Sequence, residues 1–100
     1  MSLKDVDIPE PVEQWIQHLE TNRRYSGHTL AAYRRDLQQL VLLADGKQLN
    51  QLVNGNIRHF LGRLHAQGHE PRSLARMLAA WRGFYKWWAP QINMATNPAA

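Results

Sequence analysis

The sequence predicts a small all-α domain of four helices joined by short connections. Three observations lead to this fold class. Apolar residues recur at helical spacing in four separate stretches, proline, glycine or capping residues bound these stretches, and no stretch alternates apolar and polar residues as a half-buried strand would. One hundred residues are enough for one domain with a modest core.

The first helix is predicted to begin at two prolines, Pro9 and Pro11, which suit the first turn because their missing N–H would be unpaired there in any case. Residues 1–9 are expected to be a flexible N-terminus. The polar stretch 21–27 interrupts the helical pattern. The apolar residues at i, i+3, i+4 and i+7 are Val12, Trp15, Ile16 and Leu19.

The second helix is predicted to follow Ser26, whose hydroxyl can accept a hydrogen bond from a free N–H of the first turn. The helix should run to about Ala44, because the segment 45–47 has the composition of a turn. Its apolar positions at helical spacing are Leu30, Tyr33, Leu37, Leu40 and Val41.

The third helix is predicted after a cap at about Asn54, and Gly68 suits the left-handed position just beyond its end. Gly62 lies in mid-helix, where glycine costs about 1 kcal/mol against alanine. Its presence suggests the close approach of another helix. The apolar positions are Ile57, Phe60, Leu61 and Leu64.

The fourth helix is predicted to open at Pro71 and to run to about Ala89, before Pro90. Residues 91–100 have no period and are expected to be mostly extended. On a helical wheel, one stripe about 120° wide contains the expected core residues. These are Leu74, Met77, Leu78, Trp81, Phe84, Tyr85 and Trp88.

The opposite side of the fourth helix combines basic residues with small ones and contains no acid. A side that is only solvated tends to contain Glu–Lys pairs at i, i+4. Arginine and serine are donors suited to phosphates and guanine edges, and small residues allow a bulky partner to come close. This side therefore favours a DNA groove as its partner. It consists of Arg72, Arg76, Ala79, Gly83 and Lys86, with Ser73 and Ala80 at its flanks.

The far side of the second helix has the same composition, with Arg34 at its border and Asp36 toward one edge. The charge of the chain points the same way, because residues 1–22 have a net charge of −4 and residues 23–100 one of +8. A basic body favours a polyanionic partner. The residues on this far side are His28, Ala31, Ala32, Arg35 and Gln39.

Other chemistry finds no support in the residues. The absence of cysteine excludes disulfides, thiolate zinc sites and thiol nucleophiles, and no two of the five histidines form an i, i+4 pair within one helix. There is no glycine-rich phosphate loop and no carboxylate paired with a base, so no cofactor and no metal are expected. No segment has the pattern of a membrane span or a signal peptide, which makes the cytoplasm the expected compartment.

Three stretches resemble the N-terminal core-binding domain of tyrosine site-specific recombinases of the XerC type. "YSGHTLAAYRRDL" at 25–37 is similar to the Ser-x-x-Thr-x-x-x-Tyr second helix of that domain, and "GHEPRSLARMLAAWRGFYKWW" at 68–88 is similar to its fourth helix. "NPA" at 97–99 resembles the tripeptide that ends the domain before the interdomain linker. The sequence departs from the pattern at Gly27 and at 54–56, where a Thr cap and an Asp are usual.

The resemblance implies an orthogonal bundle of four to five helices, built as two crossed helical hairpins of the SAM-like, lambda-integrase N-terminal type. Residues 10–96 would be the core-binding domain and residues 97–100 the start of the linker. The second and fourth helices would reach the major groove of double-stranded DNA. By position, the residues implied to meet DNA are His28, Thr29, Ala32, Arg35, Arg72, Ser73 and Arg76, with Arg82 and Lys86 as weaker candidates.

The resemblance also implies a role. The domain would grip half of a short, partly palindromic recombination site, as half of a clamp around the duplex, during site-specific recombination and chromosome-dimer resolution. A XerD-like sister recombinase would bind the adjacent half-site. The family's tyrosine nucleophile and its assisting residues belong to a following C-terminal domain, so these 100 residues are expected to have no catalytic activity and no small-molecule substrate.

Two alternatives remain at this point. An unrelated helical DNA-binding regulator would need a recognition helix after a short turn in helix-turn-helix geometry, which the long, acid-free second and fourth helices fit less well. A helical protein-interaction module would bind through apolar surface, and its binding would not depend on salt.

Overall fold

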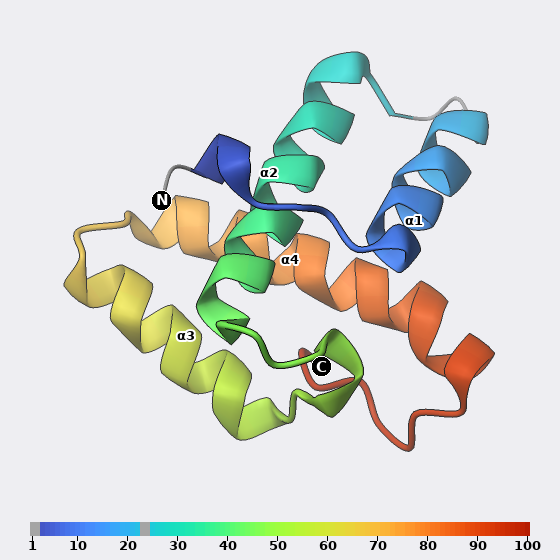
Figure 1. The fold of residues 1–100 in the computed structure, drawn as a ribbon. Coiled ribbons are helices and arrows are strands. Elements are labelled where there is room, and N and C mark those ends of the chain that lie inside the picture. The colour runs from blue at the N-terminus through green and yellow to red at the C-terminus, as the bar shows by residue number, and fades with distance from the viewer. Residues whose placement is uncertain (1–2, 23–24) are drawn as a thin grey trace.

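The computed structural model describes residues 3–22 and 25–100, and four α-helices make up most of this part of the chain (Figure 1). No strand occurs in it, so the predicted all-α class is confirmed. Three short 3-10 helices lie at Leu3–Asp5, Leu49–Gln51 and Ala89–Ile92. The α-helices are α1 (Glu10–Thr21), α2 (Gly27–Ala44), α3 (Asn54–Ala66) and α4 (Pro71–Trp88).

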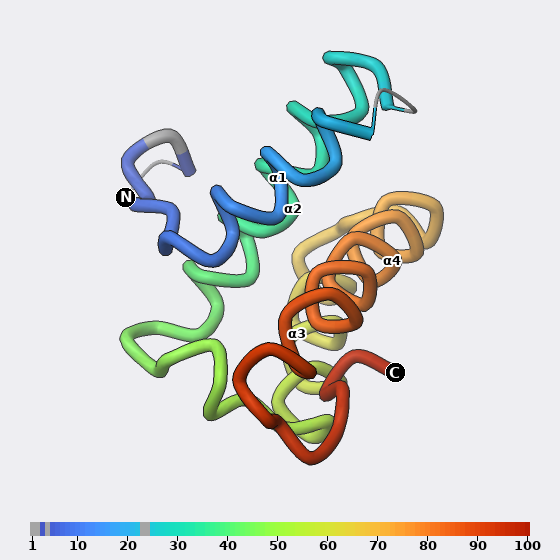
Figure 2. The backbone as a smooth tube through the Cα atoms, turned by 90° about the vertical axis from the view of Figure 1, so that its right-hand side faces the viewer, coloured from blue at the N-terminus to red at the C-terminus, as the bar shows by residue number. Residues whose placement is uncertain are grey.

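The helices form two hairpins that cross each other. Figure 2 shows the α1–α2 hairpin on one side of the molecule and the α3–α4 hairpin on the other. Helix α4 is central, because it contacts α1, α2 and α3, and its contact with α2 is the most extensive. The crossing leaves one side of α2 and one side of α4 uncovered, and these sides hold the candidate functional residues.

Large aromatic side chains of α4 fill the space between the hairpins. Trp81, Phe84 and Tyr85 are fully buried. The indole N–H of Trp81 donates to the main-chain carbonyl of Asp36, at 2.7 Å, and so ties α4 to α2. The Tyr85 hydroxyl donates to the carbonyl of Leu49, also at 2.7 Å. These bonds satisfy the polar atoms that the buried rings bring into the core.

The predicted start of α2 is confirmed and that of α3 is one residue off. The Ser26 hydroxyl accepts from the N–H of Thr29 at 3.1 Å, as expected of an N-cap. In α3 the capping position is Val53, not Asn54, because the side chain of Asn56 accepts from the Val53 N–H at 2.9 Å. Asn54 is the first helical residue.

The mid-helix glycines have roles other than those predicted. A Cβ at Gly62 would meet nothing within 4 Å, so no helix approaches it and the prediction of close packing there is wrong. A Cβ at Gly83 would lie 3.3 Å from the ring of Trp15. Gly83 is therefore the place where α1 packs closely on α4. Gly68 has a φ of +96°, as predicted for its position after α3.

The C-terminal segment folds back onto the bundle and is not extended, contrary to the prediction. After the short helix Ala89–Ile92, the chain turns at Asn93, which has a φ of +56°, and returns along α4. Ala99 is 2% exposed. The N-terminal segment is also packed, since Val6 is buried and its carbonyl accepts from the side chain of Gln38 on α2.

Candidate nucleic-acid interface

The exposed side of α4 is a continuous row of basic and small residues, called here the α4 stripe. Each member lies three or four residues from another member, which places all of them on one side of the helix. No acidic residue occurs in α4. The stripe consists of Arg72, Ala75, Arg76, Ala79, Arg82 and Lys86, all of them exposed.

The stripe is rotated from the side that the sequence predicts. Ala80 is 2% exposed and Gly83 packs against Trp15, so both face the interior. Ser73 is half-buried, whereas Ala75 and Arg82 are exposed. The small residues at 80 and 83 thus serve helix packing, because they let α4 lie close to its neighbours.

Arg76 forms the central contact between the stripe and α2. Its Nε donates to Oδ2 of Asp36 at 3.1 Å, and its Nη2 donates to Oδ1 at 2.9 Å. The carboxylate is buried, with a side chain only 2% exposed, whereas the Arg76 side chain is 49% exposed. Hydrogen bonding to Asp36 raises the pKa of the Arg76 guanidinium above its usual value, with burial acting in the opposite direction.

Two cations of the stripe point to solvent at its ends. Arg72 lies in the first turn of α4, and Lys86 lies in the last turn. Both residues are exposed, and neither forms an ion pair with a residue in the described ranges 3–22 and 25–100. They are therefore available to an anionic partner.

Arg82 has an interaction within the chain. Its Nε donates to the carbonyl of Ala99 at 3.1 Å, and its own carbonyl accepts from the Asn97 side chain at 3.1 Å. The Asn54 side chain donates to the carbonyl of Pro98 at 3.1 Å. These three bonds define the C-terminal clasp, formed by Asn54, Arg82 and residues 97–99.

The candidate residues of α2 lie in its first half. His28 and Arg35 are exposed, and Ala32 is half-buried. The hydroxyl of Thr29 lies 3.0 Å from that of Ser26, so it is already engaged at the helix cap. Arg34 pairs with Glu13 of α1.

The ion pair of Arg76 joins the two exposed sides. It anchors the middle of the α4 stripe to Asp36, the residue that follows exposed Arg35 in α2. Asp36 is buried, whereas the sequence predicts it toward one edge of the far side of α2. A signal for its burial exists, because Tyr33, Asp36 and Leu40 fall at i, i+3 and i+7 along the apolar stripe of α2.

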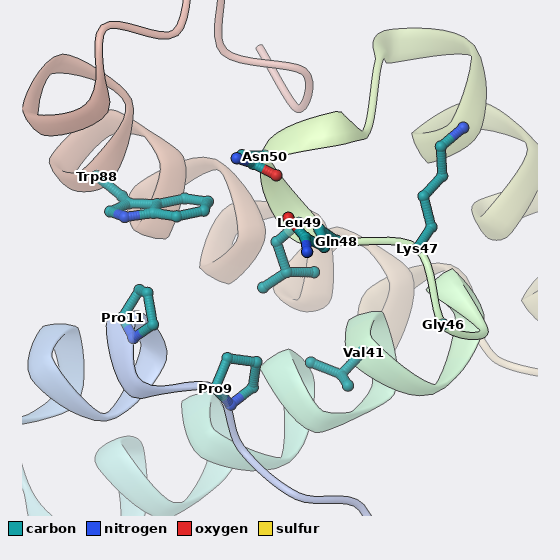
Figure 3. Close-up of a pocket in the computed structure, with 9 residues that line it drawn as sticks. All are labelled: Pro9, Pro11, Val41, Gly46, Lys47, Gln48, Leu49, Asn50 and Trp88. Carbon is teal, nitrogen blue, oxygen red and sulfur yellow. The ribbon is translucent and has the colours of Figure 1, made fainter.

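The structure also contains an apolar cavity of about 390 Å³ away from the ion pair (Figure 3). Pro9, Pro11, Val41 and Trp88 are among the residues that line it, and Lys47 is its one charged lining residue. Figure 3 shows the Lys47 side chain extending away from the other lining residues. No pair of groups for acid–base or nucleophilic chemistry lines this cavity.

Residues 3–22 and 25–100 contain no helix long and apolar enough to cross a membrane. The same ranges contain no group of three or more histidine, aspartate or glutamate side chains placed to hold a metal ion.

Fold and surface together define a small helical domain with a basic, acid-free helix face. The model of the family "Phage integrase, N-terminal SAM-like domain" matches residues 12–91. The chain belongs to this family. No solved structure matches the chain.

The chain is also similar to curated proteins named tyrosine recombinase XerC. That of Chromobacterium violaceum is 42% identical over 93 residues, which are 93% of this chain and 31% of that protein. That of Pseudomonas aeruginosa is 40% identical over 91 residues, covering 88% of this chain and 30% of the relative. That of Xanthomonas campestris is 40% identical over 92 residues, covering 89% and 29%. The chain thus spans about a third of the length of these relatives.

Proposed function

We propose that the chain is the DNA-binding domain of a XerC-like tyrosine recombinase and grips a half-site of a recombination sequence in double-stranded DNA. The observation that carries the proposal is the α4 stripe, in which exposed Arg72, Arg76 and Lys86 share one side of a helix with exposed alanines. Small side chains let a helix lie deep in the major groove, and exposed cations can neutralise phosphates or donate to base edges. Family membership and the similarity to XerC proteins support it.

The proposed role within the whole protein rests on the same similarity to XerC proteins. The half-site would be part of a site used for chromosome-dimer resolution, and a XerD-like sister recombinase would bind beside it. The cytoplasm, expected from the sequence, is the compartment that suits this role. His28 and Arg35 of α2 would contact the same duplex as the α4 stripe, because the Asp36–Arg76 pair joins these two helices.

The proposal is tested by replacing cations on the α4 stripe and on another face. The probe is a fluorescent 20-base-pair duplex enriched from a random pool by binding to residues 1–100, and its scrambled version is the comparison. Arg72→Ala and Lys86→Ala should each weaken binding to both duplexes and lower the salt slope by about 1, as expected for phosphate contacts. Anisotropy titrations at several salt concentrations give both quantities.

The matched control is Arg63→Ala, which removes the same charge from an exposed position of α3. It should leave the affinity and the salt slope nearly unchanged. An equal loss for Arg63→Ala and Arg72→Ala would mean that affinity follows net charge and not the α4 stripe. Binding that ignores salt in all variants would favour a protein-interaction module.

Residues 1–100 by themselves are expected not to cleave DNA. Tyr85 is fully buried, with its hydroxyl bonded to Leu49, and Tyr33 stacks on Trp15 with ring centroids 5.7 Å apart. The Tyr85 hydroxyl is therefore not accessible to a phosphate. A duplex with a nick that traps covalent intermediates should yield no adduct with this chain, and an adduct would contradict the expectation.

A further inference from the structure

Among residues 5–22 and 25–100, Asp36 is the one charged residue that is buried. A buried carboxylate needs hydrogen-bonded cations or N–H groups, because its water shell is lost. Arg76 supplies this partner through two hydrogen bonds of 3.1 and 2.9 Å. The pair therefore holds the guanidinium in one orientation, since the group is planar and both of its bonded nitrogens are fixed.

The bonds to Asp36 use one edge of the guanidinium and leave another free. Nε and Nη2 face the carboxylate, whereas the edge formed by Nη1 and Nη2 retains N–H groups with no partner among the described side chains. The Arg76 side chain is 49% exposed. A fixed pair of N–H donors on a helix surface is the geometry that reads O6 and N7 of guanine.

The charge of the pair separates Arg76 from its neighbours on the α4 stripe. The carboxylate of Asp36 offsets the charge of Arg76, whereas Arg72 and Lys86 have no such partner in the described residues. An arginine with its charge offset contributes little to phosphate attraction. Such an arginine can still contribute to DNA binding through directed hydrogen bonds from its free edge.

We propose that Asp36 is a positioning residue that aims the free edge of Arg76 at a guanine in the major groove. This inference rests on the proposed DNA-binding function and deepens it, because it assigns base recognition to Arg76 and phosphate attraction to the cations at the ends of the α4 stripe. Asp36 itself does not touch DNA, since its side chain is only 2% exposed.

The experiment compares Asp36→Asn, Arg76→Lys and the double variant Asp36→Asn/Arg76→Lys on the enriched duplex and on its scrambled version. Arg76→Lys keeps the charge and loses the fork, so the preference for the enriched duplex should fall roughly 5- to 150-fold. Asp36→Asn should lose much of the same preference, and the double variant should lose no more than Arg76→Lys alone, as coupled residues do.

Asp36→Asn should also change DNA affinity in a direction that a loss of structure would not produce. The variant removes a negative charge, so its affinity for the scrambled duplex should rise and its salt slope should steepen by up to about 1. A destabilised domain would bind both duplexes less well. Asp36→Glu keeps the charge and shifts the carboxylate by one methylene, so it should reduce the preference without changing the salt slope.

The controls separate failure of this inference from failure of the proposed function. If Arg72→Ala weakens binding but Asp36→Asn and Asp36→Glu keep the full preference, DNA binding stands and the positioning role is overturned. If no variant, Arg72→Ala included, changes binding, the proposed function itself fails. Thermal melting reports folding, and if both Asp36 variants are unfolded at the binding temperature, Asp36 is a structural residue and the inference is overturned.

Discussion

Tyr85 is a buried side chain that packs in the core and also needs a hydrogen-bond partner for its hydroxyl. Its ring lies in edge contact with Phe84, with centroids 5.2 Å apart, and its hydroxyl donates to the carbonyl of Leu49 just before α3. The bond connects the end of α4 to the connection between the hairpins. Burial raises the pKa of Tyr85 far above its ordinary value near 10, because the interior disfavours the phenolate.

The raised pKa of Tyr85 predicts that the domain loses stability in alkali. Above pH about 10 the unfolded chain releases this proton and the folded chain keeps it, so ionisation favours unfolding. The free energy of unfolding should fall by up to about 1.4 kcal/mol per pH unit above that point from this group alone. Urea titrations between pH 8 and 11 measure the slope.

Two replacements identify the source of this slope. Tyr85→Phe removes the titrating group and should flatten the slope above pH 10 by about one proton, although it costs roughly 1 kcal/mol at neutral pH through the lost bond to Leu49. Tyr25→Phe, at an exposed position, should leave the slope of the parent chain. The same slope in Tyr85→Phe as in the parent would show that Tyr85 does not cause it.

At the scale of elements, the contact between α1 and α4 depends on Trp15 and Gly83. The Trp15 ring is held by stacking on Tyr33 and by an edge contact with Phe84, with centroids 5.7 and 5.9 Å away. It therefore has little room to move away from α4. Gly62 in α3 is the opposite case, an exposed helical glycine with open space around it.

The two glycines predict opposite responses to alanine. Gly62→Ala should stabilise the domain by about 0.5–1 kcal/mol, because alanine loses less backbone entropy in a helix. Gly83→Ala should be less stable than Gly62→Ala by about 1 kcal/mol or more, because the new Cβ would lie 3.3 Å from the Trp15 ring. Chemical denaturation compares them, and equal gains would mean that Trp15 yields without cost.

The helices could be predicted from the sequence because their apolar residues repeat with the helical period. The buried residues Val12, Trp15, Ile16 and Leu19 of α1 are those that the spacing indicates. It is harder to predict which side of α4 is exposed, because alanine and glycine suit both an interior contact and a surface. The sequence therefore predicts Ala80 and Gly83 on the wrong side. For Gly83, only the neighbouring Trp15 ring shows that the residue packs against α1.

Pairings between distant residues could not be predicted, because no local pattern encodes them. Asp36 and Arg76 are 40 residues apart in sequence, and Arg76 looks from the sequence like an unpaired cation among small residues. The folded-back tail is a similar case. Residues 91–100 contain no periodic pattern, and their position depends on hydrogen bonds to Asn54 and Arg82. The assignment of individual residues to DNA stays a prediction.

At the scale of the whole molecule, the C-terminal clasp connects the tail to both helices of the second hairpin. The Asn97 side chain donates to the Arg82 carbonyl and accepts from the Ala99 N–H at 2.9 Å. Pro98 and Ala99 are buried. The tail therefore adds apolar contacts as well as hydrogen bonds to the domain. Small domains are only marginally stable, so these contacts are a sizeable part of the free energy of unfolding.

Asn97→Ala should destabilise the domain by roughly 1–3 kcal/mol, because it removes two hydrogen bonds and leaves the Ala99 N–H without its partner. The amide of Ala99 should also exchange its hydrogen faster. Asn50→Ala, at an exposed site, is the matched control and should change stability by less than about 0.5 kcal/mol. Denaturation and hydrogen exchange that do not distinguish the two variants would contradict a tail held by Asn97.

The clasp also determines how far any longer chain that continues past Ala100 can reach. A tether counted from the end of α4 would include the dozen residues 89–100, which could span about 40 Å if they were free and extended. With Ala99 bonded to Arg82, that length is taken up against the bundle and the tether starts at Ala100. The hydrogen bonds of Asn54, Arg82 and Asn97 thus shorten the radius within which a following segment can search.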